Sequence, residues 1–317
     1  MILQPKDRED LSAKIAAAKN SGTRIETFDL SSLADIVHHT PEDMTVAVEA
    51  GMTLSALQTR LRERGQWLPI DPPNPDRLSI GALLAMAPSG PRRFGHGTVR
   101  EHLIGIEVAL ADGRAIKAGG QVVKNVAGYD LCKLFVGSRG ALGCIVEATF
   151  KLRPLPDEER FVKRLTPDYA AADRLIANVL ESPITPIAIE LHGTQSGTLE
   201  MVLGFAGSKP EVDWQIERAG ELGFNEPADL AHEVDFWRTP RGKIHTVSTL
   251  PSSLSETLDR LSPEVFVARA GNGQIHYLGR PPSGASTIPA ALTRRTKQMF
   301  DPDEVFPSPS WTAQLQS

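Results

Sequence analysis

The chain has 317 residues, with 34 lysines and arginines against 39 aspartates and glutamates, so its formal net charge is −5. Apolar residues make up 41% and charged residues 23%, which is typical of a globular protein large enough for about two domains. The mild acidity argues against a nucleic-acid-binding protein, which usually carries a basic face. No apolar stretch approaches the roughly 20 residues that span a bilayer, and no secretory signal is visible, so we expect a cytoplasmic protein.

Cysteine is scarce, since only Cys132 and Cys144 are present, and both stand among apolar neighbours. This predicts small buried side chains and a reducing compartment rather than a disulfide framework. Two thiolates also cannot hold a four-cysteine iron–sulfur cluster within one chain. The adjacent histidines His38 and His39 have no further ligand at suitable spacing, so we expect no metal site.

The first half of the chain predicts mixed helices and strands. A helix is expected at 6–19, strands at 23–28 and 44–51, a helix at 54–65 capped by Thr53, and a helix or turn at 79–87. The run 103–119 predicts a hairpin about the dipeptide Asp112-Gly113, and 144–154 predicts a strand.

The composition changes near Pro154–Pro156, which predicts a domain boundary. Beyond it we expect a helix at 167–182, strands at 185–193 and 198–207, and a helix at 212–222. A second round follows, with a strand at 243–251, a helix at 253–262, strands at 264–271 and 273–279, and a last helix at 289–300. Two rounds of helix and paired strands predict an antiparallel sheet covered by helices on one face.

Glycine is distributed unevenly. Twelve of the 26 glycines lie between Gly81 and Gly143, and only Gly22, Gly51 and Gly65 precede that stretch. Neither a P-loop nor a strand–GxGxxG–helix pattern is present. Small residues between 79 and 90 could still let a pyrophosphate approach backbone N–H groups, although glycines that only shape turns would look the same.

Three segments in a fixed order carry a specific resemblance: GMTLSALQTRLRERGQWLPIDPP, SIGALLAMAPSGPRRFGHGTVREHLIGIEVALADGRAIKAGG and QVVKNVAGYDLCKLFVGSRGALGCIVEATFKLRPLP. They closely resemble the FAD-binding subunits of bacterial glycolate oxidase, within the vanillyl-alcohol-oxidase (PCMH-type) flavoproteins, and MFDPDEVF resembles the family's C-terminal signature. The resemblance implies an α+β protein: a PCMH-type FAD-binding domain of two α/β lobes at 1–155, a cap or substrate domain at 156–290, and a segment at 291–317 that returns to the FAD-binding domain.

The resemblance also implies which residues contact a non-covalently held FAD. The family's turn against the FAD pyrophosphate matches residues 79–82. The loop beside the flavin matches residues 89, 90, 97 and 98, and the segment that borders the cofactor matches residues 140, 143 and 145. These residues are Ser79, Ile80, Gly81, Ala82, Ser89, Gly90, Gly97, Thr98, Gly140, Gly143 and Ile145. A further segment, Lys124 to Asp130, matches a pattern characteristic of the subfamily, with a structural or a catalytic role.

The chain departs from the family at one place. Family members carry a glycine-rich loop that wraps the FAD diphosphate, whereas the corresponding stretch here, KNSGTRIETFDLSSL, is shortened and keeps only Gly22. A diphosphate needs several converging N–H donors, so losing this loop would cost several kcal/mol of binding free energy, on the order of one or two charge-assisted hydrogen bonds. Ala82 also stands where the family usually has a second glycine.

Candidate catalytic residues lie in the second half of the chain. A 2-hydroxy acid oxidase needs a guanidinium for the substrate carboxylate and a base for the hydroxyl proton. The stretch WRTPRGKIH offers Arg238, Arg241, Lys243 and His245, and the later strands offer Arg269 and His276, although solvated strand and loop residues would give the same pattern.

The sequence therefore supports three hypotheses. The first is the FAD-binding subunit of a glycolate-oxidase-like complex that oxidises a small 2-hydroxy acid by hydride transfer to flavin, together with a second flavin subunit and an iron–sulfur subunit. The second is a cofactor-free scaffold subunit that keeps the fold without tight FAD binding. The third is a lone FAD-dependent dehydrogenase of another hydroxy compound.

Overall fold

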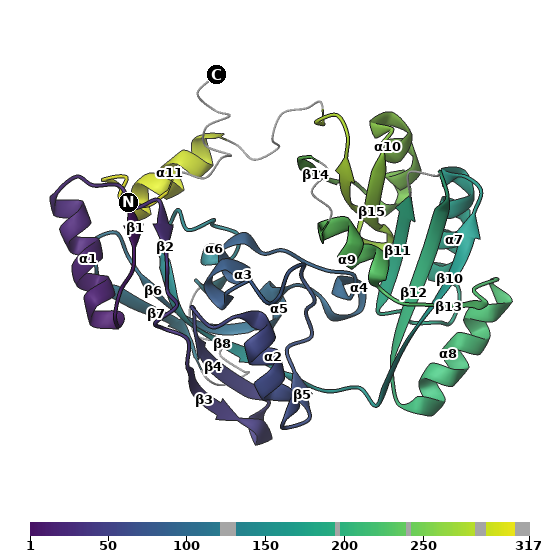
Figure 1. The fold of residues 1–317 in the computed structure, drawn as a ribbon, viewed down its shortest axis with the longest axis horizontal. Helices are drawn as coiled ribbons and strands as arrows, with labels where there is room; N and C mark the ends of the chain where they lie inside the picture. The colour runs from purple at the N-terminus through teal and green to yellow at the C-terminus, as the bar shows by residue number, and fades with distance from the viewer. Residues whose placement is uncertain (121–130, 194–196, 239–241, 283–289, 308–317) are drawn as a thin grey trace.

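The computed structural model describes residues 1–120, 131–193, 197–238, 242–282 and 290–307. Two large β-sheets, one from each half of the chain, organise it (Figure 1). The first half forms a five-stranded sheet of order β3-β4-β8-β6-β7, and the second half forms a seven-stranded sheet of order β13-β10-β12-β11-β15-β16-β14. The expected α+β class is confirmed, as is the antiparallel cap sheet.

The five-stranded sheet is antiparallel throughout and packs against short helices. Apolar residues of the strands and helices share one buried cluster, in which Val48, Leu57, Leu83 and Phe150 are fully buried. The strands are β3 (Ile36–Thr40), β4 (Thr45–Glu49), β6 (Leu103–Ala109), β7 (Ala115–Gly119) and β8 (Cys144–Lys151), with the small pair β5 (Gln66–Trp67) and β9 (Arg153–Pro154) beside them. The helices are α2 (Leu54–Arg62), α3 (Ile80–Met86), α4 (Arg93–His96), α5 (Val99–His102) and α6 (Cys132–Phe135).

A second, smaller lobe contains β1 (Ile2–Leu3), α1 (Arg8–Asn20) and β2 (Thr27–Phe28). Its two strands pair in parallel, which requires the crossover that α1 provides. The C-terminal helix α11 (Ala290–Phe300) leads the chain back to this lobe, where the carbonyl of Val305 accepts the N–H of Ile25 at 2.8 Å and Phe306 is fully buried. The C-terminal segment therefore completes the core of the N-terminal lobe.

The cap sheet is antiparallel along its whole width. Its strands are β10 (Glu158–Thr166), β11 (Ala188–Gly193), β12 (Leu199–Gly207), β13 (Glu226–Ala228), β14 (Ile244–Ser248), β15 (Val265–Arg269) and β16 (Gln274–Leu278). The helices are α7 (Tyr169–Glu181), α8 (Lys209–Glu221), α9 (Ala231–Arg238) and α10 (Leu254–Leu261).

The two faces of the cap sheet differ in chemistry. One face packs its apolar side chains against α7, α8 and α10 in a continuous buried cluster. Because side chains alternate along a strand, the residues between them point to the other face, among them Glu190, Arg269 and His276. The short helix α9 lies on this second face, where Phe236 packs with Val267 and Leu278.

Several elements were absent from the sequence-based expectation, among them β3, β10 and α9. Strand β10 lies in the stretch interpreted as a domain boundary, because its charged residues mask any alternation of apolar and polar side chains. Helix α9 has only eight residues, four of which are charged or polar, so its periodicity is weak. All three elements hold their conformation through contacts with neighbouring strands rather than through local signals.

The segment from Ser89 to Gly97 joins the two halves. The N–H of Gly95 donates to the carbonyl of Ile187 at 2.9 Å, and a Cβ at Gly95 would lie 2.6 Å from the Cα of that residue. A Cβ at Gly271 would lie 2.4 Å from the ring of Phe94. Glycine is therefore required on both sides of this contact, and the cap is closely docked on the first half of the chain.

Within the described part of the chain, none of the helices combines the length and the apolar character that crossing a bilayer would require.

Candidate active site

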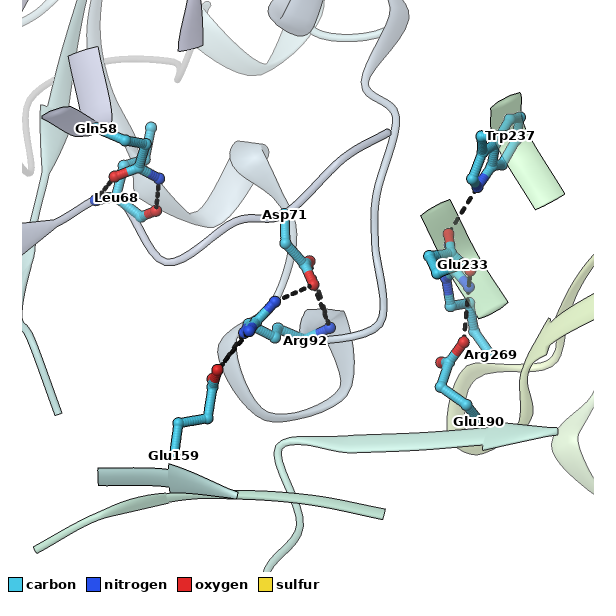
Figure 2. A network of polar contacts seen from close by, with 9 residues as sticks. All are labelled: Gln58, Leu68, Asp71, Arg92, Glu159, Glu190, Glu233, Trp237 and Arg269. Carbon is cyan, nitrogen blue, oxygen red and sulfur yellow. Dashed lines mark hydrogen bonds and ion pairs between the residues drawn. The ribbon is translucent and has the colours of Figure 1, made fainter. Parts of the chain in front are cut away.

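A cavity of about 560 Å³ lies where the two halves of the chain meet, a volume in the range of small-molecule sites. Helix α2 and the loop after β5 form one wall, the start of β10 forms another, and α9 closes it from the cap side. Figure 2 shows the charged residues that reach this region, which belong to two clusters around Arg92 and Arg269. The cavity is therefore framed by buried ion pairs from both halves of the chain.

The first cluster connects the two halves directly. The guanidinium of Arg92 donates to Glu159 of β10 through Nε at 2.7 Å and to Asp71 through Nη1 at 3.0 Å, and its backbone N–H also donates to the Asp71 carboxylate. All three side chains are largely buried. Three of its five N–H donors bond to these two carboxylates, so the charge of Arg92 is already balanced within the cluster.

Both carboxylates of this cluster line the cavity, Asp71 from the loop after β5 and Glu159 from the start of β10. Burial raises the pKa of the Asp71 carboxyl above the ordinary value, and the positive charge of Arg92 opposes part of that effect. A carboxylate with a raised pKa accepts a proton more readily near neutral pH. Asp71 therefore lies where a general base would meet a ligand in the cavity.

The second cluster lies beneath α9 on the polar face of the cap sheet. Arg269 is almost completely buried, and its Nη1 donates to Glu190 and to Glu233, each at 2.7 Å, while its Nη2 contacts the other oxygen of Glu233. Burial raises the pKa of Glu190 to about 8. Glu190, His232 and Glu233 approach each other closely enough to share a metal ion, but the Arg269 guanidinium already supplies the positive charge between the two carboxylates.

Two further arginines line the cavity, Arg62 at the end of α2 and Arg238 at the end of α9. Both side chains are exposed, and neither forms an ion pair with another residue in the described ranges. Arg238 was among the arginines weighed from the sequence, whereas Arg62 was not. These two guanidiniums, rather than Arg92 or Arg269, are available to a carboxylate.

The predicted catalytic residues do not converge. Arg241 lies outside the described residues. His245 packs against Tyr277, on the face of the sheet that turns to α10, so it points away from the cavity. His276 lies on the opposite face: its Nδ1 is 2.9 Å from the hydroxyl of Thr246, its ring meets the ring of Trp237 edge-on at 5.0 Å, and burial lowers its pKa to about 4. His276 thus stands behind the cavity wall as a neutral side chain.

The predicted pyrophosphate turn is the start of α3, and its N–H groups already have acceptors. The N–H of Ile80 donates to the carbonyl of Met52 at 2.8 Å, and that of Gly81 donates to the carbonyl of Ala50 at 2.7 Å. Ser79 caps the helix, because its hydroxyl accepts the N–H of Ala82 at 3.2 Å. This turn therefore does not fit a diphosphate, since it has no converging free donors.

The stretch interpreted from the sequence as a shortened loop forms a tight turn beside this site. After β2 the chain turns at once through Leu30 and Leu33, and the N–H of Gly51 donates to the carbonyl of Leu33 at 2.8 Å. A Cβ at Gly51 would lie 1.8 Å from the carbonyl oxygen of Leu30. The turn thus packs directly on the end of β4.

The loop after α6 offers a better fit to a cofactor. Gly137 and Gly140 have positive φ angles of 81° and 75°, and an added Cβ at either would meet no atom within 4 Å. Between them, the Oγ of Ser138 is buried and has no hydrogen-bond partner among the described residues. The N–H groups of Gly137 and Arg139 donate to carbonyls of α3, so this loop lies directly beside α3.

The other predicted cofactor residues have structural contacts of their own. Ser89 donates from its hydroxyl to Gln274 of the cap at 3.1 Å, and Gly90 lies so close to Asp71 that no Cβ would fit. Thr98, which follows Gly97, caps α5 by exchanging hydrogen bonds with Glu101. The remaining two, Gly143 and Ile145, pack into the core beside Val108, and the Lys124 to Asp130 segment lies outside the described residues.

The charged residues of the cavity were missed from the sequence, except for Arg269 and Arg238. Asp71 stands in LPIDPP and Arg92 in GPRR, both within segments that carried the resemblance, yet neither shows a spacing typical of a catalytic motif. Glu159, Glu190 and Glu233 stand on three separate elements. Only information about which residues lie close together in space could have grouped these three glutamates.

Comparison with known proteins gives consistent results. Residues 21–119 match the family described as FAD binding domain. The chain is 34% identical over 149 residues to glycolate oxidase subunit GlcD of Bacillus subtilis, a match that covers 47% of this chain and 32% of the relative. It is 34% identical over 140 residues to glycolate oxidase subunit GlcE of Escherichia coli, covering 44% and 40%, and 38% identical over 211 residues to a probable mitochondrial D-lactate dehydrogenase of Danio rerio, covering 62% and 42%.

The matched regions span less than half the length of these curated relatives. Among solved structures, an alkyldihydroxyacetonephosphate synthase superposes with a TM-score of 0.72 at 16% identity, over 96% of this chain and 75% of that one. This likeness shows the fold alone. The match of residues 21–119 to the FAD binding domain family agrees with the resemblance found in the sequence.

Proposed function

Because this chain carries the FAD binding domain of the glycolate-oxidase-like PCMH-type flavoproteins, we propose that it is an FAD-dependent oxidoreductase subunit acting on a small 2-hydroxy acid. The observation that carries the proposal is the cavity between the two halves of the chain, with a carboxylate inside and two free guanidiniums on its walls. The similarity to glycolate oxidase subunits and to a D-lactate dehydrogenase supports the substrate class.

The chain's own residues have separate roles in this proposal. Asp71 takes the proton of the substrate hydroxyl, and Arg92 keeps its carboxylate oriented. Arg62 and Arg238 contact the substrate carboxylate from the two sides of the cavity. FAD, when bound, supplies the hydride acceptor, and the residues that fit it are those around Gly137, Ser138 and Gly140.

Onward electron transfer needs another chain. The two cysteines cannot ligate a four-thiolate cluster, so an iron–sulfur subunit would receive the electrons, and a second flavin subunit would complete the assembly. The subunit names of the bacterial relatives favour such an assembly. The substrate and the partners are therefore proposed together, as one multi-subunit oxidase.

A second function is favoured by one specific observation. The N–H groups at the start of α3 are bonded to Ala50 and Met52, and the Leu30–Leu33 turn leaves no glycine-rich loop in front of them. A subunit with this arrangement could keep the fold and serve assembly without tight FAD binding. This alternative differs from the first in one measurable property, the amount of bound flavin.

The test combines absorbance with turnover. The full chain, purified alone and with its co-expressed neighbours, is scanned for flavin bands and assayed for glycolate- or D-lactate-dependent reduction of an artificial electron acceptor. We expect bound flavin and turnover in at least the assembled form, with Asp71→Asn lowering kcat by about 100-fold and the cavity-lining control Asp76→Asn changing it little. Flavin-free protein that is inactive in both forms would establish the assembly role instead.

A further inference from the structure

Helix α9 is a wall of the cavity with few buried apolar contacts. It has eight residues, a length that is not stable as an isolated helix. Of its apolar side chains, Phe236 is buried, whereas Val234 is 43% exposed. Beside this small apolar cluster, polar contacts hold α9 on the sheet.

Those contacts centre on one guanidinium. Arg269 projects from the end of β15 into the space between the sheet and α9, where it meets Glu233 of the helix and Glu190 of the neighbouring strand β11. At 1% exposure Arg269 is the largest fully buried side chain among the described residues. It is the cation that links α9 to two strands of the cap.

The link continues to the cavity surface. The Nε1 of Trp237 donates to the Oε1 of Glu233 at 2.6 Å, one helical turn away, and both residues line the cavity. His276 supports the Trp237 ring from behind. The next residue along the helix is Arg238, so the position of α9 decides where both the indole and this free guanidinium stand.

Arg269 is the cation that faces both buried carboxylates of the cluster, Glu190 and Glu233. Burial raises the pKa of Glu190 to about 8, whereas Glu233 contacts the guanidinium through both of its carboxylate oxygens. Removing the guanidinium would leave that carboxylate buried without a cation. The helix would then be expelled toward water together with Glu233, because an unpaired buried charge is strongly unfavourable.

We propose that Arg269 is a positioning residue, which acts through Glu233 to hold α9 against the cap sheet and so places Trp237 and Arg238 on the ligand-facing wall of the cavity. It contacts no ligand itself, because it lies behind the wall. The identity of that ligand, a small 2-hydroxy acid, rests on the proposed function, whereas the hold on α9 does not.

The hold on α9 is tested by hydrogen exchange in the full chain. In Arg269→Met we expect amides of 231–238 to exchange about 100-fold faster, while those of α7, on the opposite face of the sheet, keep the wild-type rate. Arg269→Lys should recover part of the protection. The matched control is Arg160→Met, which removes an arginine of the same sheet from its exposed pair with Asp213. Unchanged exchange in α9, or an equal rise throughout the cap, would overturn the proposal.

A separate experiment measures how the Arg269→Met substitution affects ligand binding. Trp67 and Trp237 both line the cavity, so glycolate binding should alter the tryptophan emission. We expect glycolate to bind Arg269→Met about tenfold more weakly, and in the active assembly we expect KM to rise about tenfold with kcat within about threefold. A loss confined to kcat contradicts a positioning role. If wild-type protein shows neither an emission change nor turnover, the proposed function fails, and the exchange experiment still decides the role of Arg269.

Discussion

The ion pairs of Arg92 provide the sharpest test of how the two halves of the chain are held together. In Arg92→Met the Asp71 and Glu159 carboxylates lose their shared cation, while the methionine side chain occupies much of the same volume. The Arg92 side chain is 18% exposed, that of Asp71 15% and that of Glu159 23%, so water can solvate the stranded charges only in part. Breaking a buried pair in this way costs about 3–5 kcal/mol of unfolding free energy.

Urea unfolding, followed by far-ultraviolet circular dichroism and tryptophan emission, measures this cost. With an m-value of about 3 kcal/mol/M, the midpoint should fall by roughly 1–2 M. Arg160→Met serves as the control, because Arg160 and Asp213 are 35% and 48% exposed and no measurable change is expected there. Adding Asp71→Asn and Glu159→Gln to Arg92→Met should restore most of the midpoint, since no buried carboxylate is then left unpaired.

Two results would refute the reasoning. Equal midpoints for Arg92→Met and the exposed control would mean that the ion pairs contribute nothing to the contact between the halves. A triple variant no more stable than the single one would mean that lost packing, rather than stranded charge, causes the destabilisation.

Three further predictions concern stability. Gly51→Ala should lower the melting temperature, with a loss of about 1–3 kcal/mol, because its Cβ would meet the carbonyl oxygen of Leu30 at 1.8 Å; an unchanged melting curve would show that the turn can move away. The pKa of Glu190 is raised from about 4.5 in the unfolded chain to about 8 in the folded protein. Glu190 therefore contributes its full share of unfolding free energy below pH 4.5, and this share is lost as the pH rises through 8. Glu190→Gln should therefore flatten the decline of unfolding free energy between pH 5 and 8, and parallel profiles would contradict this. Asp301→Asn should cost about 3 kcal/mol by calorimetry, because the carboxylate pairs with buried Lys297 and accepts the N–H groups of Val305 and Phe306 at 2.8 Å; a loss below 1 kcal/mol would contradict a buried ion pair.

The residues that line the cavity, rather than those suggested by residue type alone, should be substituted first. Arg269 and His276 were reasonable candidates on residue type, yet one is neutralised by two carboxylates and the other stands behind Trp237. Arg238→Gln should weaken glycolate binding, whereas Arg60→Gln, an exposed arginine of α2 away from the cavity, should not. The affinity measured by tryptophan emission separates the two variants.

The sequence alone determined most of the local structure. Helix α1 begins where the Asp7 side chain accepts the N–H of Asp10, and α2 begins where Thr53 accepts that of Ala56, because such caps depend only on residues three apart. The dense glycines and their flanking motifs also identified the FAD-binding domain, since a resemblance of this kind is carried by order and spacing along the chain. The shortened loop was likewise visible as a stretch with Gly22 alone.

Only the tertiary structure decided what surrounds the cavity. Asp71, Arg92 and Glu159 are separated by up to 88 positions in the sequence, and no periodicity connects them, yet one guanidinium binds both carboxylates. The same holds for Arg269 with Glu190 and Glu233, whose contact depends on how β15, β11 and α9 pack. Whether an arginine is free for a substrate depends on the carboxylates that folding places beside it, and the residues next to it in the sequence do not reveal them.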